Sequence, residues 1–237
     1  MYRFFENKVF ENEIELSEEN SHHFSKVLRI KESEIVEVCA DNGIFESAFE
    51  RIEGNNIILK KIRAVGLKNE SKVNLTLFQG ILKGDKMDQA LKQATEAGVS
   101  KIHPLKLKRT ISNISGKEEK KVQRWQKVVE SAAKQSKRDY IPEVTHPLKL
   151  EELKDLSGDM DIIVPYENQL GTTLFDLKSL SNNIALVIGP EGGFEESEIN
   201  FLREIGANII TLGNRILRAE TAAVCSSFSI IYYLESR

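Results

Sequence analysis

The sequence contains few cysteines and no long apolar run. Its two cysteines, Cys39 and Cys225, lie far apart in apolar strings, and no Cys/His cluster has the spacing of a zinc site. We therefore expect two buried, reduced thiols and no metal. No apolar run reaches the length of a transmembrane helix, and residues 1–6 are too few and too charged for a signal peptide. Together these absences predict a cytoplasmic protein that does not enter a membrane.

Three common catalytic and nucleotide-binding motifs are also absent. The chain has no P-loop ending in Gly-Lys-Ser/Thr, no Gly-x-Gly-x-x-Gly and no Gly-x-Ser-x-Gly elbow. Its four histidines have no partner spaced for metal binding or for activating a nucleophile. These absences argue against an ATPase, a dinucleotide enzyme and a serine hydrolase. With 41% hydrophobic and 29% charged residues, the composition is that of an ordinary globular protein.

Positive charge is concentrated in the middle of the chain. Residues 1–70 carry 10 Lys/Arg against 14 Asp/Glu, a net charge of −4. Residues 71–150 carry 17 against 8, a net of +9, and residues 151–237 carry 6 against 14, a net of −8. A basic middle between acidic ends suggests an anionic partner, although a set of solvated lysines would look the same.

Residues 1–70 are predicted to form a small β-barrel. Short strands are expected at 35–40, 44–49 and 57–62, separated by Asn-Gly and Gly-Asn-Asn turn signals. Ser17 is a candidate cap for a short helix that runs to Leu28. The polar stretch 66–72 is the expected domain boundary, which gives domains of residues 1–70 and 71–237.

From residue 71 onward the pattern alternates between apolar strands and helices. Strands are expected at 73–78, 102–107, 161–164, 184–188 and 208–212, and helices at 85–97, 117–138, 195–205 and 219–234. Unbroken apolar strands between helices predict a parallel sheet covered on both faces.

The strongest candidate site is the glycine loop, Gly189-Pro190-Glu191-Gly192-Gly193, which follows one of these strands. Glycines at the carboxyl end of a parallel strand allow close approach of a ligand. The loop contains no lysine, and its glutamate together with those that follow it would repel a phosphate. A ligand that carries positive charge and an adenine therefore fits better. The alternative is a Gly-Pro turn without a ligand.

A second loop, residues 212–222, also follows a strand and opens a helix. It carries Arg215, Arg218 and Glu220 among apolar residues, and a carboxylate near a helix N-terminus is an ordinary placement. We expect the two loops to lie side by side at the sheet edge and to share a pocket. The helix at 117–138 adds a stripe of lysines and arginines that suits phosphate contacts.

The two loops together resemble those of the bacterial RsmE family, the small-subunit ribosomal RNA (uracil-N3)-methyltransferases of the SPOUT class. The resemblance covers nearly the whole chain. It includes Arg3-Phe4-Phe5, Val27-Leu28-Arg29, Lys83-Gly84-Asp85-Lys86-Met87-Asp88, Ala94-Thr95-Glu96, Trp125-x-Lys127, Gln135-Ser136-x-Arg138 and Ile141-Pro142. Two departures are visible. Lys92-Gln93 stands where the family usually has Gln-Lys, and Ala97 replaces the usual Leu.

The resemblance implies an α/β fold with a PUA-like RNA-binding β-barrel at residues 1–70. A SPOUT methyltransferase domain with a deep trefoil knot would follow at 71–237, the knot loops being 165–170, 188–194 and 212–218. It also implies S-adenosylmethionine as cofactor and a homodimer through the knotted domain. The residues implied for cofactor binding are Pro165, Tyr166, Glu167, Ile188, Gly189, Pro190, Glu191, Gly192, Gly193, Leu212, Gly213, Ile216, Leu217, Arg218, Thr221 and Ala222.

The implied reaction methylates N3 of a uridine in 16S ribosomal RNA, within the assembled small subunit. We expect Arg218 to stabilise the uracil anion, and Glu220 to position Arg218 or accept a proton. The candidate RNA contacts are Arg3, Arg29, Lys83, Arg109, Lys134 and Arg138. Three alternatives stay open at this point: a SPOUT enzyme for ribose 2′-O or another base, a non-enzymatic RNA-binding assembly factor, and an unrelated α/β ligand-binding module.

Overall fold

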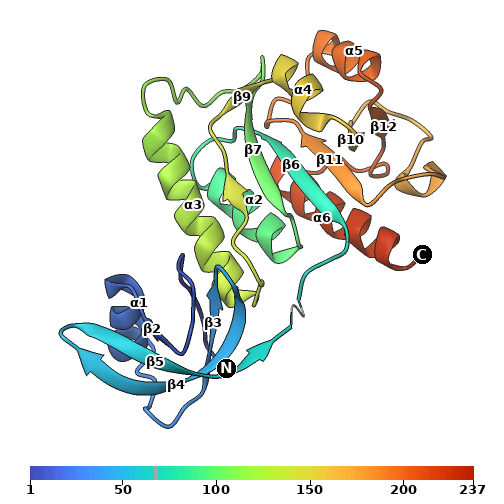
Figure 1. The fold of residues 1–237 in the computed structure, drawn as a ribbon. Coiled ribbons are helices and arrows are strands. Elements are labelled where there is room, and N and C mark those ends of the chain that lie inside the picture. Colours follow the sequence, from blue (N-terminus) through green and yellow to red (C-terminus); the bar gives the residue numbers. More distant parts are fainter. Residues whose placement is uncertain (67–68) are drawn as a thin grey trace. The chain divides into compact units, whose positions relative to one another are not determined.

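The computed structural model describes residues 1–66 and 69–237 and divides into two compact units (Figure 1). The N-terminal unit contains Met1–Glu70 together with Lys134–Tyr140, and the C-terminal unit contains Ser71–Ala133 and Ile141–Arg237. The sequence analysis placed residues 134–140 in the second domain, whereas in the structure they belong to the N-terminal unit. Residues 67 and 68, in the expected boundary stretch, lie outside the described residues.

The N-terminal unit is built on a mixed five-stranded sheet in the order β1-β3-β4-β5-β2. The β1/β3 pair is parallel and the other pairs are antiparallel. Buried aromatic and aliphatic side chains, among them Phe4, Phe10 and Leu59, form its core. The strands are β1 (Arg3–Phe5), β2 (Glu13–Glu15), β3 (Val36–Ala40), β4 (Gly43–Glu53) and β5 (Asn56–Val65).

The expected helix after Ser17 is present in two parts. Helix α1 (Glu18–His22) begins at Ser17, whose hydroxyl accepts the Asn20 N–H, and a π-helical turn, η1 (His23–Val27), follows. Arg29, just beyond, has a φ of 51°. A non-glycine residue with positive φ is uncommon, so the chain direction changes sharply at this exposed arginine.

The C-terminal unit contains a parallel sheet in the order β12-β10-β11-β6-β7-β8, with β9 also paired to β7. Every pair is parallel, which confirms the prediction from the apolar strands. The strands are β6 (Asn74–Gly80), β7 (Lys101–Lys106), β8 (Glu143–Val144), β9 (Leu148–Lys149), β10 (Asp161–Pro165), β11 (Asn183–Ile188) and β12 (Asn208–Ile210).

Helices cover both faces of this sheet (Figure 1). One face packs against α2 (Asp85–Glu96), α3 (Glu118–Gln135) and α6 (Ala219–Glu235), and the other against α4 (Leu153–Ser157) and α5 (Glu196–Glu204). The four long helices lie where the sequence predicts them. The strands β8 and β9, helix α4 and the 3-10 turns η2 (Leu150–Glu152) and η3 (Leu174–Asp176) were not predicted, because they are too short to show a period.

One cysteine differs from its expected environment. Cys39 is buried, and burial raises the pKa of its thiol to about 12, as expected for an inert thiol. Cys225 is exposed on α6, so the expectation of a buried thiol was wrong there. The reason is that Cys225 lies on a helix face with Phe228 and Tyr232, which are 58% and 65% exposed, and an apolar stripe alone does not reveal whether it is covered.

Candidate functional site

The candidate site lies at the carboxyl edge of the parallel sheet. Because the strands run in one direction, the segments after β6, β7, β10, β11 and β12 all leave from this edge. Open parallel sheets bind ligands at this edge. The glycine loop follows β11 here, as the sequence predicts.

The glycine loop comes very close to the end of β6. A Cβ atom on Gly80 would lie 2.6 Å from the backbone nitrogen of Pro190, and one on Gly189 would lie 3.0 Å from the ring of Phe194. Gly80 has no room for a larger residue, and a side chain at Gly189 would require the Phe194 ring to shift. The Gly193 N–H donates to the Pro190 carbonyl at 2.9 Å, so the loop is a tight turn held against β6.

The segment after β7 holds the glycine loop from the other side. Arg109 Nε donates to Glu195 Oε1 at 2.8 Å, and Arg109 NH1 donates to the Gly192 carbonyl at 3.2 Å. A Cβ on Gly192 would lie only 2.9 Å from the Cβ of Arg109. The Lys108 N–H donates to Glu198 Oε1 at 2.8 Å. The segment after β7 therefore fixes both the glycine loop and the start of α5.

Glu191 connects the glycine loop to the start of α2. Its Oε1 accepts the Lys83 N–H at 3.0 Å and lies 3.4 Å from Lys86 Nζ. Burial opposes ionisation of Glu191, but the Lys83 N–H and the Lys86 ammonium outweigh it, so the pKa of this carboxyl is lowered. The loop itself has no lysine, yet its glutamate meets the ammonium of Lys86 from α2 and the backbone N–H of Lys83 just before that helix, which sequence reasoning missed.

The second loop does not lie directly beside the glycine loop, as the sequence analysis expected. Strand β10 lies between β11 and β12 in the sheet. The expectation failed because the order of strands along the chain does not fix their order in a sheet. The segment after β10 packs against the glycine loop: a Cβ on Gly193 would lie 2.5 Å from Glu167 Oε1, and the Tyr166 ring meets Phe194 edge-on at 6.5 Å. After β12, the Thr211 N–H donates to the Thr172 carbonyl at 2.8 Å.

Three buried acceptor oxygens near this edge have no hydrogen-bond partner among the described residues. They are Gln79 Oε1 at the end of β6, Glu191 Oε2 and Glu220 Oε2 in the first turn of α6. A buried polar atom without a partner costs about 1–3 kcal/mol, so these oxygens favour a ligand that brings donors or positive charge. Gln79 is a polar residue on an apolar strand, and that interruption is the signal that could have identified it.

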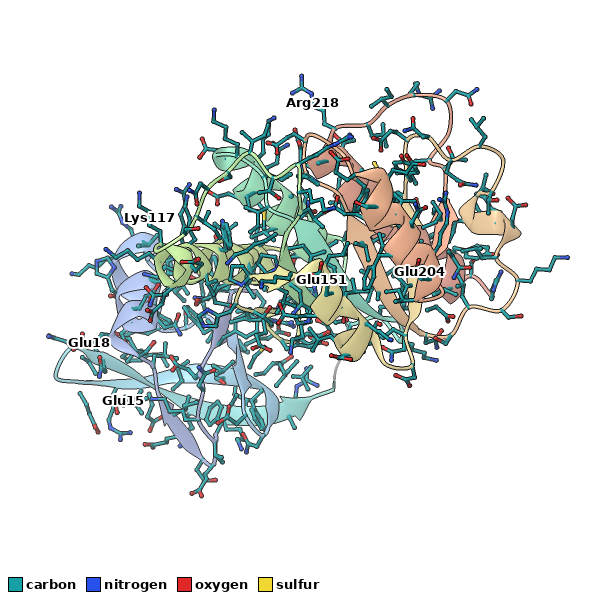
Figure 2. All side chains as sticks on the ribbon, turned by 90° about the horizontal axis from the view of Figure 1, so that it is seen from above. Glu15, Glu18, Lys117, Glu151, Glu204 and Arg218 are labelled. Atoms are coloured by element: carbon teal, nitrogen blue, oxygen red, sulfur yellow. The ribbon has the colours of Figure 1, made fainter. Side chains whose placement is uncertain are left out.

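The two proposed catalytic residues differ in environment. Glu220 is 5% exposed, whereas Arg218 is exposed and its side chain points away from the ribbon (Figure 2). No hydrogen bond or ion pair joins them in the part of the chain that the structure describes. The expected positioning of Arg218 by Glu220 is therefore not present within a single chain. The remaining second-loop residues Leu212, Leu217, Thr221 and Ala222 are half-buried, and Gly213 and Ile216 are exposed.

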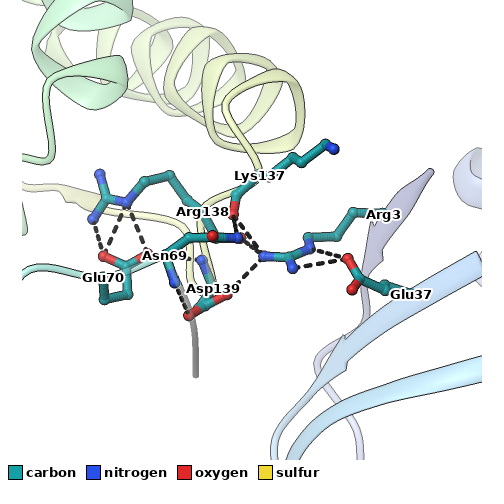
Figure 3. Close-up of polar contacts among 7 residues, drawn as sticks. All are labelled: Arg3, Glu37, Asn69, Glu70, Lys137, Arg138 and Asp139. Carbon is teal, nitrogen blue, oxygen red and sulfur yellow. Dashed lines mark hydrogen bonds and ion pairs between the residues drawn. The ribbon is translucent and has the colours of Figure 1, made fainter. Parts of the chain in front are cut away.

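Two of the expected RNA contacts are buried in ion pairs of the N-terminal unit (Figure 3). Arg3 lies 2.8 Å from Glu37 and 2.7 Å from Asp139, and Arg138 lies 2.7 Å from Glu70. Both arginine side chains are 3% exposed. The expectation that they contact RNA does not fit this burial, because sequence alone cannot tell a paired arginine from a free one.

The other expected RNA contacts are accessible. Arg29 and Lys83 are exposed, and the side chain of Arg109 is 45% exposed beside Glu195. Lys134 is half-buried and donates to Asn20 Oδ1 at 3.3 Å. Within the described residues, no cluster of His, Cys, Asp or Glu could hold a metal, and no helix has the length and apolarity needed to span a membrane.

Comparison with known proteins places the chain among RNA-modifying enzymes. The model of the RNA methyltransferase domain family matches residues 69–230. Ribosomal RNA small subunit methyltransferase E of Mesomycoplasma hyopneumoniae is 32% identical, over 94% of this chain and 96% of the relative. The Bacillus subtilis protein of the same name is 29% identical, over 92% of this chain and 89% of the relative.

Solved structures agree with the sequence relatives. A ribosomal RNA small subunit methyltransferase E from Neisseria gonorrhoeae, bound to S-adenosyl methionine, is 29% identical with a TM-score of 0.88, covering 98% of both chains. A putative methyltransferase from Legionella pneumophila with bound cofactor SAM is 28% identical with a TM-score of 0.88, covering 98% of this chain and 97% of the other. The chain therefore belongs to the RNA methyltransferase family, as a member of its ribosomal RNA small subunit methyltransferase E group.

Proposed function

We propose that this protein transfers a methyl group from S-adenosylmethionine to N3 of a uridine in 16S ribosomal RNA. The observation that carries the proposal is the glycine loop at the carboxyl edge, which is held against Gly80 and carries a buried Glu191 oxygen with no hydrogen-bond partner among the described residues. The relatives named ribosomal RNA small subunit methyltransferase E support the substrate, and the two similar structures with bound cofactor support the methyl donor.

The residues at the edge fit this cofactor. S-adenosylmethionine carries an ammonium, a sulfonium and an adenine amino group, which are cationic or donate hydrogen bonds. The unpartnered oxygens of Gln79, Glu191 and Glu220 could accept from or neutralise such groups. At Gly189 and Gly193 the absence of a side chain lets Phe194 and Glu167 pack against the loop backbone. We propose that the loops 165–170, 188–194 and 212–218 together hold the cofactor, which supplies the methyl group as an electrophilic sulfonium.

The chain must also prepare the uracil. N3 is a poor nucleophile while it is protonated, so the site has to stabilise the anion that forms. Arg218 is an exposed cation at the start of α6 that makes no ion pair or hydrogen bond with any described residue, and a guanidinium can bind an imide anion without giving up its proton. Glu220, whose buried Oε2 has no hydrogen-bond partner in the described part of the chain, is the candidate to accept the proton. Holding the reacting atoms in line would supply much of the rate.

We further propose that the C-terminal segment forms a deep trefoil knot. Strand β12 is the edge strand next to β10. The helix that follows it, α6, nevertheless packs against α2 and against strands β11 and β6. The chain therefore has to cross back past the β10 segment, where Thr211 bonds Thr172. Chain knots are rare, and the resemblance to the SPOUT class is the second reason for proposing one here.

The exposed stripe on α6 supports a homodimer. Phe228 and Tyr232 stack at 5.8 Å between ring centroids while remaining largely exposed, and exposed aromatic residues are enriched at protein interfaces. A partner subunit would cover this stripe. Arg218, exposed at the start of the same helix, would then lie near the interface. We also propose that the N-terminal unit is a PUA-like RNA-binding domain, and that the substrate is the assembled small subunit.

Mass spectrometry of nucleosides from ribosomal RNA tests the proposed reaction. Cells with the gene should contain 3-methyluridine in 16S RNA, and cells without it should lack this nucleoside and regain it on complementation. Loss of a 2′-O-methyl or of a different methylated base would show another chemistry on the same fold. If no modification changes and calorimetry detects no binding of S-adenosylmethionine, the result favours a non-enzymatic RNA-binding assembly factor over a methyltransferase.

A further inference from the structure

A charged groove lies between α2 and α3 in the C-terminal unit, outside the glycine loop. Its volume is about 990 Å³, and its walls come from these two helices alone. Arg124 on α3 reaches across to Asp85, at 3.3 Å, and to Asp88 on α2. These ion pairs connect the two helices across the groove and hold its two walls in place.

The groove has an excess of positive charge. Its ionisable lining residues are Lys92, Lys120, Arg124, Lys127, Asp88 and Glu96. Asp88 is paired with Arg124, whereas the three lysines are exposed and make no ion pair or hydrogen bond with any residue that the structure describes. Unpaired cations that face one another across a groove attract a linear anion. The whole chain, by contrast, has a net charge of −3.

Helical spacing explains why these side chains converge. Lys120, Arg124 and Lys127 lie at positions i, i+4 and i+7 on α3, and Asp88, Lys92 and Glu96 lie four residues apart on α2. Such positions share one face of a helix. Gln93 also lines the groove, so an amine would remain there if Lys92 and Gln93 were exchanged. The altered order of these two residues thus keeps a lysine in the groove.

The groove begins at the edge that carries the glycine loop. Helix α2 follows β6 directly, and the Lys83 N–H before it binds Glu191. Helix α3 follows the segment from β7 that includes Arg109 and contacts Gly192. Both helices run away from the edge, and α2, with 12 residues, extends about 18 Å. A strand that places a base at the glycine loop could continue along this groove.

We propose that the α2/α3 groove binds the sugar-phosphate backbone of the RNA strand next to the target uridine. Lys92 contacts phosphates from one wall, and Lys120 and Lys127 contact them from the other. The amides of Gln93 and Gln123, which also line the groove, bond ribose hydroxyls or base edges. A target base must leave its stack to reach the cofactor, and the groove holds the flanking strand while it does so. This inference rests on the proposed function.

The test compares two triple variants with the wild-type protein. Lys92→Gln, Lys120→Gln and Lys127→Gln together remove the free cations of the groove. Lys72→Gln, Lys154→Gln and Lys178→Gln remove the same charge from exposed lysines elsewhere in this unit. Affinity for a 16S RNA fragment is measured by fluorescence anisotropy at several salt concentrations. Affinity for S-adenosylmethionine is measured by calorimetry, and methyl transfer to small subunits with labelled cofactor.

For the groove triple we expect the Kd for RNA to rise about tenfold and the slope of log Kd against log salt to fall by about two, since each lost phosphate contact removes 0.7–0.9. Cofactor affinity and kcat at saturating subunits should be retained, and KM for subunits should rise. The control triple should change the slope by much less. Equal RNA affinities and slopes for the two triples would overturn the proposal.

Two other results have separate meanings. If the groove triple binds naked RNA normally but binds small subunits weakly, the groove receives a ribosomal protein, and the RNA proposal is wrong. If the wild-type protein transfers no methyl group to any RNA, the proposed function itself fails. If the groove triple binds RNA as the wild type does and the wild-type enzyme is active, only the proposal about the groove is contradicted.

Discussion

The guanidinium of Arg109 donates to the Glu195 carboxylate at 2.8 Å while also reaching the carbonyl of Gly192 at 3.2 Å. One side chain thus fixes both the glycine loop and the start of α5. Sequence reasoning assigned Arg109 to RNA binding. Its place in the structure makes it a positioning residue for the loop that we propose holds the cofactor.

Arg109→Ala and Glu195→Gln should each weaken S-adenosylmethionine binding about threefold, the scale of a partly exposed ion pair. The double variant should be no weaker than Arg109→Ala alone, because loss of Arg109 already removes the Glu195 contact together with the hydrogen bond to the Gly192 carbonyl. Calorimetry without RNA measures this. Arg203→Ala, on the exposed side of α5, is the control. If Arg109→Ala leaves cofactor affinity unchanged but weakens RNA binding, Arg109 is a direct RNA contact, as the sequence analysis expected.

Gly80→Ala should disturb the glycine loop through simple crowding. The added methyl carbon would lie 2.6 Å from the Pro190 nitrogen and 2.8 Å from the Gly189 carbonyl carbon. We expect a loss of about 1–3 kcal/mol in the free energy of unfolding, measured by urea denaturation, together with weaker cofactor binding. Gly66→Ala, where a Cβ would meet nothing within 4 Å, should be nearly neutral. Equal stability of the two variants would contradict the close approach.

Asp139→Ala should destabilise the N-terminal unit, because it leaves the buried Arg3 without one of its carboxylates. Removal of one partner from a buried pair costs about 3–5 kcal/mol. Urea denaturation of the full chain would show this as a lower midpoint. Asp139→Asn, which keeps an acceptor for the guanidinium, should lose less. A neutral effect of Asp139→Ala would show that Glu37 and the backbone carbonyls alone satisfy Arg3.

His103 should make the stability of the protein depend on pH. It stacks on Phe78 at 4.7 Å and bonds Thr145 at 2.8 Å. Burial, reinforced by Lys101, lowers the pKa of His103 to about 4 from its ordinary value of 6.5. The unfolded chain therefore binds the extra proton first, and the contribution of neutral His103 is complete above pH 6.5 and lost as pH falls towards 4.

The measurement is urea denaturation of the wild type and of His103→Asn between pH 7.5 and 4.5. The wild type should lose about 2–3 kcal/mol more than the variant over this range, from a shift of this size at 1.36 kcal/mol per pKa unit. Because both proteins share all other titrating groups, the difference isolates His103. Parallel curves would contradict a strongly lowered pKa.

The sequence predicted those parts of the fold that local periodicity determines. The long helices, the parallel strands and the turn at Gly189–Gly193 fall into this class, because the spacing of apolar residues and glycines can be read directly from the sequence. The order of strands in the sheet cannot be read in this way, so the position of β10 between the two loops was missed. Burial of Arg3 and Arg138 depends on carboxylates more than 30 residues away, and their pairing could not be foreseen.

The candidate site divides in the same way. The glycine motif of Gly189–Gly193 was visible because few other functions require such a cluster after an apolar strand. The contacts around it come from distant segments: Gly80 from β6, Lys86 from α2 and Glu167 from the β10 segment. None is recognisable alone. Only the folded chain shows that Gln79 and Glu220 have buried oxygens without a hydrogen-bond partner among the residues that the structure describes.

The most direct test of the central claim is methyl transfer by the purified protein to small ribosomal subunits isolated from cells that lack the gene. Mass spectrometry of the digested 16S RNA should show one new 3-methyluridine with the wild-type protein and S-adenosylmethionine. Arg218→Ala should form almost none of this nucleoside, even at cofactor concentrations that saturate the variant. Undiminished 3-methyluridine with Arg218→Ala, or a different methylated nucleoside with the wild type, would contradict the account.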